Sequence, residues 1–246
     1  MGWPLQIDPC PIREAVAEIR FETKIPPDAV FGVVYNELSN LYGVLEPLPI
    51  IQIPEAVRSM DQNLIFQPHY RMRRQNFVTQ VGPRVFSVAM MQPYSKWETF
   101  LKEIRDVFQK IGSLGFIESV IRVGLRYINI FEIDILSELN LSLTIIDNEI
   151  TSEEAVIRTV LPKDDFSVSL SVVNKANLID SIVKMGNISV IDIDVFSEKK
   201  SNDFFKEING NFEKAHSLEK EIFFGLLKPD FLSQLNPVYE GAKKND

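Results

Sequence analysis

A chain of 246 residues with 45% hydrophobic and 24% charged residues has the composition of a globular protein that can build a substantial core. The formal net charge of −8 argues against general binding to nucleic acid, which favours a positive protein surface. One cysteine, Cys10, excludes an intramolecular disulfide framework and a cysteine-rich zinc site, and it indicates a reducing compartment. The sequence shows neither a transmembrane-length apolar run nor a signal-peptide pattern, so we expect a soluble cytoplasmic protein with no membrane partner.

The first part of the chain combines one clear strand with one clear helix. Residues 12–21 alternate between apolar and polar side chains, a period of two that predicts a strand with one buried face. After Pro26 and Pro27, Asp28 is expected to cap a helix that continues to Gly43 with the 3.6-residue period.

A hairpin, a regular helix and a long strand follow. Gly82-Pro83 forms the turn between two strand-like runs. Ser95 and Glu98 match an S-x-x-E capping box, and Gly112 is the expected end of the helix that they begin. Residues 117–133 then read as a strand that is apolar on both faces, as a central strand would be. The apolar stripe of the helix consists of Trp97, Phe100, Leu101, Ile104, Val107, Phe108 and Ile111.

The second half changes to successive strands from residue 139 onward, separated by polar or Gly/Asp-rich turns. A short connector over 176–186 precedes the last strand. A long Phe-rich helix is predicted to start near Ser201 and to end at Lys228-Pro229, and the tail 237–246 is expected to be disordered.

This order of elements predicts an α+β protein with a mostly antiparallel sheet or sheets and Phe-rich amphipathic helices packed on one face. A first α+β lobe is expected over 11–136 and a second over 137–236, as two lobes or as one extended sheet. A strictly parallel, doubly wound sheet is disfavoured because the second half lacks crossover helices.

The segment RVGLRYINIFE, residues 122–132, raises the question of why so apolar a strand carries Arg122 and Arg126 with Gly124 between them. Glu14 and Glu18 on the first strand have the same i, i+4 spacing. If the two strands are neighbours, carboxylates can face arginines across the sheet and satisfy guanidinium donors that burial would otherwise leave unpaired. We therefore interpret the arginines mainly as part of the architecture.

The alternative for the same residues is an anion site. Arg122 and Arg126 would grip a phosphate or carboxylate, and Gly124 would allow the ligand to approach the backbone closely. Glu14 and Glu18 would then be carboxylates beside the ligand.

Acidic and histidine residues of the second half offer weaker candidates. Asp192 and Asp194 lie on one strand face, where they could bind a divalent metal or act as acid and base, although the solvent face of a half-buried strand is the commoner reading. His216 lies beside Glu213 and Glu219, which favours a solvated helix face.

The one basic and aromatic cluster comprises His69, Tyr70, Arg71, Arg73 and Arg74. Such residues can contact phosphates and stack on bases, but arginines on an edge strand or loop are also a common solubilising device. Contact with a protein or an acidic ligand is somewhat more favoured for this cluster than contact with nucleic acid.

Common catalytic and metal-binding spacings are absent from the sequence, including H-x-x-x-H, H-E-x-x-H, C-x-x-C, G-x-S-x-G, the P-loop and G-x-G-x-x-G. A nucleophile built from Cys10 and a histidine is disfavoured by the Pro-flanked position of Cys10. We assign no catalytic residue, no metal ligand and no cofactor.

Several short motifs together resemble an uncharacterised, sporadically distributed family of prokaryotic proteins of about this length. The resemblance covers nearly the whole chain, and it implies no activity and no catalytic residues. The patchy occurrence of the family implies accessory gene content, such as phage-related, defence or toxin-neutralising functions. The motifs are Pro11-Ile12-x-Glu14-Ala15, Glu18-Ile19-Arg20-Phe21, Tyr94-x-x-Trp97 and Arg122-x-Gly124-x-Arg126-Tyr127-Ile128-Asn129.

The sequence thus favours a non-enzymatic interaction protein that acts through protein contacts, with a homodimer as one form of such contact. An enzyme that handles a phosphate or another small anion through Arg122 and Arg126 is the first alternative. A nucleic-acid binder that uses residues 69–74 is the second.

Overall fold

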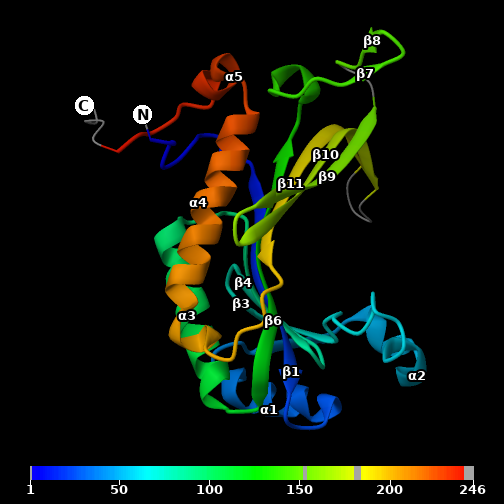
Figure 1. Ribbon diagram of the computed structural model, residues 1–246, viewed down its shortest axis with the longest axis vertical. Helices are drawn as coiled ribbons and strands as arrows, with labels where there is room; N and C mark the ends of the chain where they lie inside the picture. Colours follow the sequence, from blue (N-terminus) through cyan, green and yellow to red (C-terminus); the bar gives the residue numbers. More distant parts are fainter. Residues whose placement is uncertain (1, 152–153, 180–183, 241–246) are drawn as a thin grey trace.

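The computed structural model describes residues 2–151, 154–179 and 184–240 (Figure 1). Within these residues, nine strands form one antiparallel sheet in the order β2-β3-β4-β5-β1-β6-β11-β10-β9. The short strands β7 and β8 form a separate hairpin. The strands are β1 (Ile12–Thr23), β2 (Val44–Pro47), β3 (Tyr70–Arg74), β4 (Phe77–Val81), β5 (Val85–Met91), β6 (Ile117–Phe131), β7 (Thr144–Ile145), β8 (Asn148–Glu149), β9 (Ala155–Lys163), β10 (Phe166–Ile179) and β11 (Lys184–Ser197).

The main helices lie on one face of this sheet (Figure 1). The predicted α+β class, the mostly antiparallel sheet and the Phe-rich helices on one face are therefore confirmed. We call the opposite side of the sheet the open face, because α1, α3 and α4 leave it uncovered. The helices are α1 (Val30–Leu38), α2 (Glu55–Arg58), α3 (Trp97–Ser113), α4 (Ile208–Leu226) and α5 (Pro229–Gln234).

The two segments that the sequence suggests as lobes share this single sheet. They meet where β6 pairs with β11, and α4 of the second segment packs against α3 and β6 of the first. The buried residues of both segments form one hydrophobic cluster. The arrangement is the extended sheet that the sequence left open beside the two-lobe layout.

The strand predictions follow directly from side-chain alternation. On β1, Ala15, Ala17, Ile19 and Phe21 are fully buried under the helices, as expected from the period of two. The hairpin at Gly82-Pro83 is also confirmed, since it joins β4 and β5.

The predicted helix caps are wrong, although the predicted buried stripe is confirmed. Neither Ser95 nor Glu98 makes a capping hydrogen bond, and α3 begins at Trp97. Ser95 instead donates its backbone N–H to the sulfur of Met90, five residues earlier on β5, and Lys96 occupies the N-cap position. Gly112 lies inside α3, where an added Cβ would come 2.7 Å from the ring of Phe205. The buried residues of α3 are Phe100, Ile104, Val107, Phe108 and Ile111.

The other helices also start later or stop earlier than the sequence indicates. Asp28 lies in a 3₁₀ turn, Pro27–Ala29, and caps nothing, and α1 ends at Leu38 before Gly43. A backbone bridge between Val120 and Ser201 delays the last long helix, so that α4 begins only at Ile208.

Two predicted irregular segments are also corrected. The connector expected over 176–186 is largely the continuation of β10 and β11, with 180–183 outside the described residues. In the tail, the prediction of disorder is wrong at Val238, which forms a backbone bridge with Gln6. Residues 241–246 lie outside the described chain.

Candidate functional site

Strand β6 places both arginines of the 122–132 segment on the open face, between β1 and β11. Strands β1 and β6 are neighbours, which is the condition for the carboxylate–arginine pairing suggested by the sequence, with Glu18 opposite Gly124 and Val16 opposite Arg126. On the other side of β6, Asp194 lies opposite Arg126 and Asp192 opposite Ile128. Carboxylates thus flank the arginines from both sides. We call Glu14, Glu18, Arg122, Arg126, Asp192 and Asp194 the arginine–carboxylate network.

Arg122 is the buried centre of this network. Its side chain is 10% exposed, and its guanidinium donates to Glu18 at 3.0 Å and to Asp194 at 2.7 Å. The same guanidinium lies over the ring of Phe196, 4.6 Å from the ring centroid. The predicted pairing with Glu18 is confirmed, and the group is neutralised from two strands at once.

Gly124 explains how Arg122 reaches both partners. A Cβ built on Gly124 would lie 2.6 Å from Nη1 of Arg122 and 3.2 Å from Oδ1 of Asp194. The guanidinium therefore crosses directly over the Gly124 backbone. The absence of a side chain at Gly124 leaves room for the guanidinium of Arg122.

We expect Gly124→Ala to destabilise the protein by about 1–3 kcal/mol, because the new methyl group displaces Arg122 from its carboxylates. The measurement is the free energy of unfolding in urea. Gly32→Ala in α1 is the matched control, since an added Cβ there meets nothing within 4 Å. The control should be neutral or stabilising by about 1 kcal/mol, because alanine favours the helix. Equal effects at both glycines would contradict this account.

Arg126 has a different partner from the one expected. Its guanidinium donates to Asp192 at 2.7 and 2.6 Å, and its side chain is 47% exposed. The predicted pair with Glu14 is wrong, because β11 lies on the other side of β6 and presents Asp192 to the guanidinium. The solvent-face reading of Asp192 and Asp194 is corrected by the same finding, since their side chains are only 22% and 24% exposed and both bind arginine.

Burial and ion pairing have opposite effects on the pKa values of the carboxylates in this network. Burial raises the pKa of Asp194, and the nearby Arg122 guanidinium offsets part of that rise. Burial also raises the pKa of Glu14, against the field of Arg126. The hydrogen bonds to Asp192 raise the pKa of Arg126. The cations hold these carboxylates in a poorly solvated position, which is a structural role.

The basic cluster at 69–74 is divided between the two faces of the sheet. On β3, Arg71 and Arg73 both bind Glu46 of β2, at 2.5 and 3.2 Å. Arg74 points to the helical side, where it binds Glu103 of α3. Each of the three arginines therefore has a carboxylate partner within the chain.

The other two members of that cluster contact side chains of neighbouring segments. Tyr70 stacks on Phe31 of α1, with ring centroids 3.8 Å apart. Arg58 approaches the ring nitrogens of His69 at 2.9 and 2.7 Å, and burial followed by the Arg58 charge lowers the His69 pKa to about 4.

A second polar cluster lies under the helices and was missed in the sequence. Tyr94 and Tyr127 share a hydrogen bond of 3.1 Å between their hydroxyls, and His216 stacks on Trp97 at 3.9 Å. The predicted solvated face of α4 is therefore wrong at His216. The stacking instead brings the Tyr94-x-x-Trp97 and Tyr127 motifs together.

Glu219 is the most unusual member of this cluster. It is 5% exposed, and burial raises its pKa to about 8. No other described residue donates a hydrogen bond to its carboxyl group. It occupies the same helical stripe as Phe212, Ala215 and Phe223, so its spacing in the sequence could have revealed it.

The structure also shows where the metal-ligand candidates of the sequence and Cys10 lie. Within residues 2–151, 154–179 and 184–240, no three His, Cys, Asp or Glu side chains are placed to hold a metal ion. Asp192 and Asp194, the metal candidates of the sequence, are bound to arginines. Cys10 is exposed as a residue, but partial burial of its thiol raises the pKa of the thiol, which disfavours the reactive thiolate.

The geometry thus shows an internally neutralised network on the open face. Among the described helices, none has the length and hydrophobicity required to cross a bilayer. Comparison of the chain with models of known protein families and with curated proteins gives no match.

Proposed function

We propose that this chain is a non-enzymatic interaction protein that binds a protein partner on its open face. The observation that carries the proposal is the part of the open face on β1, β6, β11, β10 and β9, which α1, α3 and α4 leave uncovered and which two projecting segments border (Figure 1). One segment contains α2 and the other is the β7–β8 hairpin.

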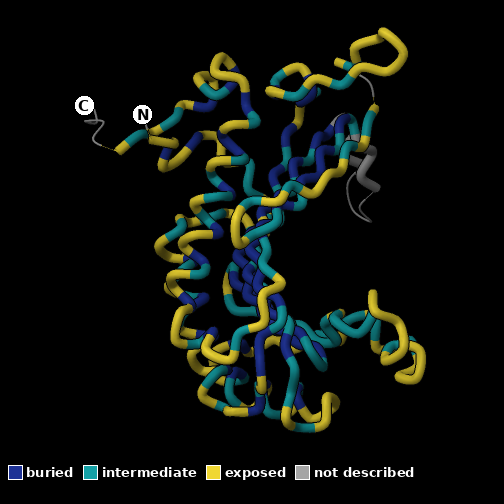
Figure 2. The backbone as a smooth tube through the Cα atoms, viewed as in Figure 1, coloured by how far each residue is buried: buried dark blue, intermediate teal, exposed yellow. Residues whose placement is uncertain are grey.

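The two projecting segments carry exposed apolar residues at their ends. Figure 2 colours the tips of both segments as exposed. Met60 after α2 is 85% exposed and Ile146 in the hairpin is 88% exposed. Val57 and Ile145 beside them are 50% and 53% exposed. Exposed apolar side chains on the two projecting segments, together with the polar side chains of the open face, suit a protein partner. Protein interfaces combine apolar anchors with polar contacts.

The charges of the open face also favour a protein partner over a polyanion. Arg71, Arg73, Arg122 and Arg126 each have a carboxylate partner on this face. A phosphate backbone or a small anion would have to displace these carboxylates. The enzyme and nucleic-acid alternatives therefore have less support than protein contact.

The resemblance to a sporadically distributed prokaryotic family suggests where such a partner belongs. Accessory gene content, such as phage-related, defence or toxin-neutralising genes, is the setting that it implies. Self-association is compatible with the same proposal.

The test places a photo-crosslinking amino acid at Ser169 on the open face of β10, or at Lys102 on α3 as the control for the helical side. In cells of the source organism, Ser169 should give a protein adduct and Lys102 should not. Adducts with nucleic acid, adducts from Lys102 alone, or no adduct from Ser169 would each overturn the proposal.

We further expect Met60→Asp combined with Ile146→Asp to weaken binding of the captured partner at least tenfold, because buried apolar anchors dominate protein interfaces. The melting temperature should stay unchanged, since both side chains are exposed. Leu5→Asp is the matched control: Leu5 is 61% exposed but belongs to the N-terminal segment beside α4 (Figure 1). An equal loss of binding from Leu5→Asp would contradict the assignment of the surface.

A further inference from the structure

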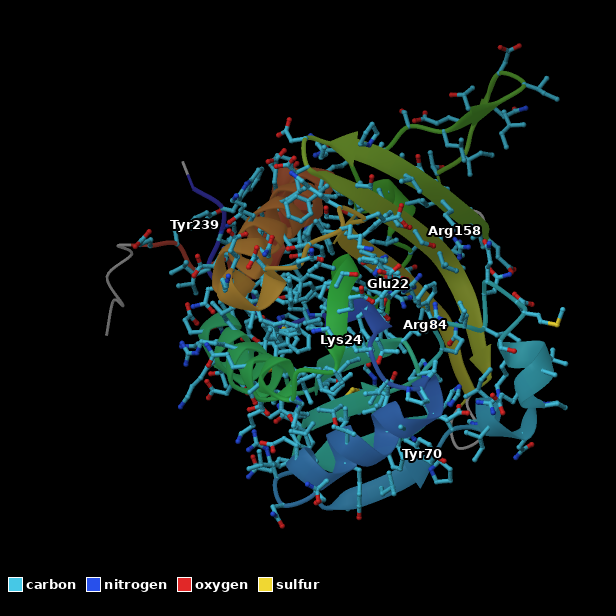
Figure 3. All side chains as sticks on the ribbon, turned by 60° about the horizontal axis from the view of Figure 1, so that its bottom comes forward. Glu22, Lys24, Tyr70, Arg84, Arg158 and Tyr239 are labelled. Atoms are coloured by element: carbon cyan, nitrogen blue, oxygen red, sulfur yellow. The ribbon has the colours of Figure 1, made fainter. Side chains whose placement is uncertain are left out.

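The two edges of the nine-stranded sheet differ in how well they are protected. At one edge, β2 spans only Val44–Pro47 and ends in a proline, which blunts further strand pairing. At the other edge, β9 spans Ala155–Lys163, and Val156 and Val160 on it are 69% and 57% exposed. Figure 3 shows β9 at the border of the sheet, with Arg158 labelled on it. Long edges with exposed apolar residues are templates for another strand.

The backbone groups that β9 presents outward follow from its hairpin with β10. Asp164 and Asp165 form a two-residue turn, so Lys163 and Phe166 face each other across it. Because hydrogen bonding alternates along a strand, the odd-numbered residues of β9 bond to β10 and the even-numbered residues point away. Pro162 fits this assignment, since a proline is tolerated where the missing N–H would face outward.

Val156, Arg158 and Val160 therefore direct their N–H and C=O groups out of the sheet. None of these groups has a hydrogen-bond partner among the described residues, where β9 pairs with β10 alone. The side chains of Val156 and Arg158 lie on the open face of the sheet. Continued alternation places the exposed Glu154 on that face as well.

We propose that β9 pairs antiparallel with β9 of a second copy of this chain, with the two-fold axis at Val156. This register places Arg158 of each copy opposite Glu154 of the other, and Val156 opposite its own equivalent. Two ion pairs then flank one apolar pair, and the outward backbone groups of residues 154, 156 and 158 hydrogen-bond across the axis. The interface is self-complementary, as a two-fold contact requires.

Other positions of the two-fold axis along β9 give less favourable pairs of residues across the interface. An axis at Arg158 places two like charges directly opposite and sets Glu154 against Pro162, which has no N–H to donate. An axis at Thr159 sets Glu154 against Asp164, again two like charges. An axis at Ile157 leaves both Arg158 side chains opposite valine. Charge complementarity thus favours Val156 and favours a second copy as the occupant of the edge.

The test is sedimentation velocity of the full chain over a range of concentrations. The wild-type chain should form a species of twice its 28.1 kDa mass. Glu154→Arg and Arg158→Glu should each raise the concentration needed for dimers at least tenfold, because each variant makes like charges face each other. An equimolar mixture of the two variants should restore dimers, since each repelling pair then becomes a complementary one, and the double variant should restore them as well.

Two proline variants distinguish the loss of strand pairing at the β9 edge from a general loss of stability. Val156→Pro removes an outward N–H and should abolish dimers with an unchanged melting temperature. Ile157→Pro removes an N–H that bonds to β10 and should lower the melting temperature. A monomeric wild-type chain, or dimers that survive Val156→Pro and both single charge variants, would overturn the proposal. Failure of the mixed variants to restore dimers would overturn the register.

Discussion

Arg122→Met is expected to destabilise the protein by about 3 kcal/mol. Removal of one partner of a buried ion pair typically costs about 3–5 kcal/mol, because a charge stays buried without compensation. Asp194 would be that charge: its side chain is only 24% exposed, and its hydrogen bond to Arg122 is 2.7 Å long. Glu18 is less affected, because Arg20 also donates to it at 2.9 Å.

Arg126→Met is the matched control for this experiment. It makes the same substitution four residues further along β6, at a side chain that is 47% exposed. An exposed ion pair contributes about 0–1 kcal/mol, so the control should shift the urea midpoint only slightly. The double variant Arg122→Met with Asp194→Asn should recover part of the lost stability, since it removes the stranded charge.

Equal stability of wild-type and Arg122→Met protein would contradict the internal role of Arg122. Such a result would return the anion-site alternative to first place, because an arginine without a structural role is available for a ligand. Glu14→Gln offers a further comparison, since no ion pair with Glu14 is found among the described residues. Glu14→Gln should change the free energy of unfolding only slightly.

The sequence predicts well where a pattern is local and repeated. Alternation along 12–21 identifies β1 and its buried face, and the 3.6-residue stripe identifies the buried side of α3. The matched spacing of Glu14 and Glu18 with Arg122 and Arg126 suggests ion pairs on the condition that β1 and β6 are neighbours, and the structure meets that condition. The predictions of β1 and of the α3 stripe succeed because each depends on a repeated pattern within one short segment of the chain.

The pairing of β6 with β11 could not be predicted in this way. Asp192 and Asp194 read as a solvent face until the sheet order places them beside the arginines. The strand order depends on long-range packing, which leaves no local signature in the sequence. The same limit applies to the start of α3, where Trp97 stacks on the distant His216 and the hydrogen bonds of the S-x-x-E pattern do not form.

Glu219→Gln is expected to stabilise the protein at alkaline pH and to leave it unchanged in acid. Burial raises the pKa of Glu219 from 4.5 to about 8, so the folded state keeps a proton that the unfolded chain loses above pH 4.5. The stability associated with this group is complete below pH 4.5 and falls as the pH rises towards 8. A pKa difference of this size corresponds to a loss of about 5 kcal/mol of stability above pH 8.

Glutamine has the shape of the protonated carboxyl group and cannot ionise. Glu219→Gln therefore removes the loss of stability that ionisation of Glu219 causes at alkaline pH. The measurement is the free energy of unfolding of both proteins from pH 4 to pH 9. The difference between them should be near zero at pH 4 and should increase to a plateau near pH 8. Glu213→Gln, on the exposed side of α4, is the control and should give a flat difference.

The difference curve isolates Glu219 from the other groups that surround it. Tyr94 and Tyr127 have raised pKa values and remain neutral throughout this range, and His216, whose pKa burial lowers to about 3, is neutral above pH 4. The charge of Lys220 lowers the pKa of Glu219 and only partly offsets the burial of the carboxyl group. A difference that does not change with pH would mean that water or a cation already stabilises ionised Glu219, and the packing of α4 against Trp97 and Tyr127 would then have to be looser than the contacts at His216 indicate.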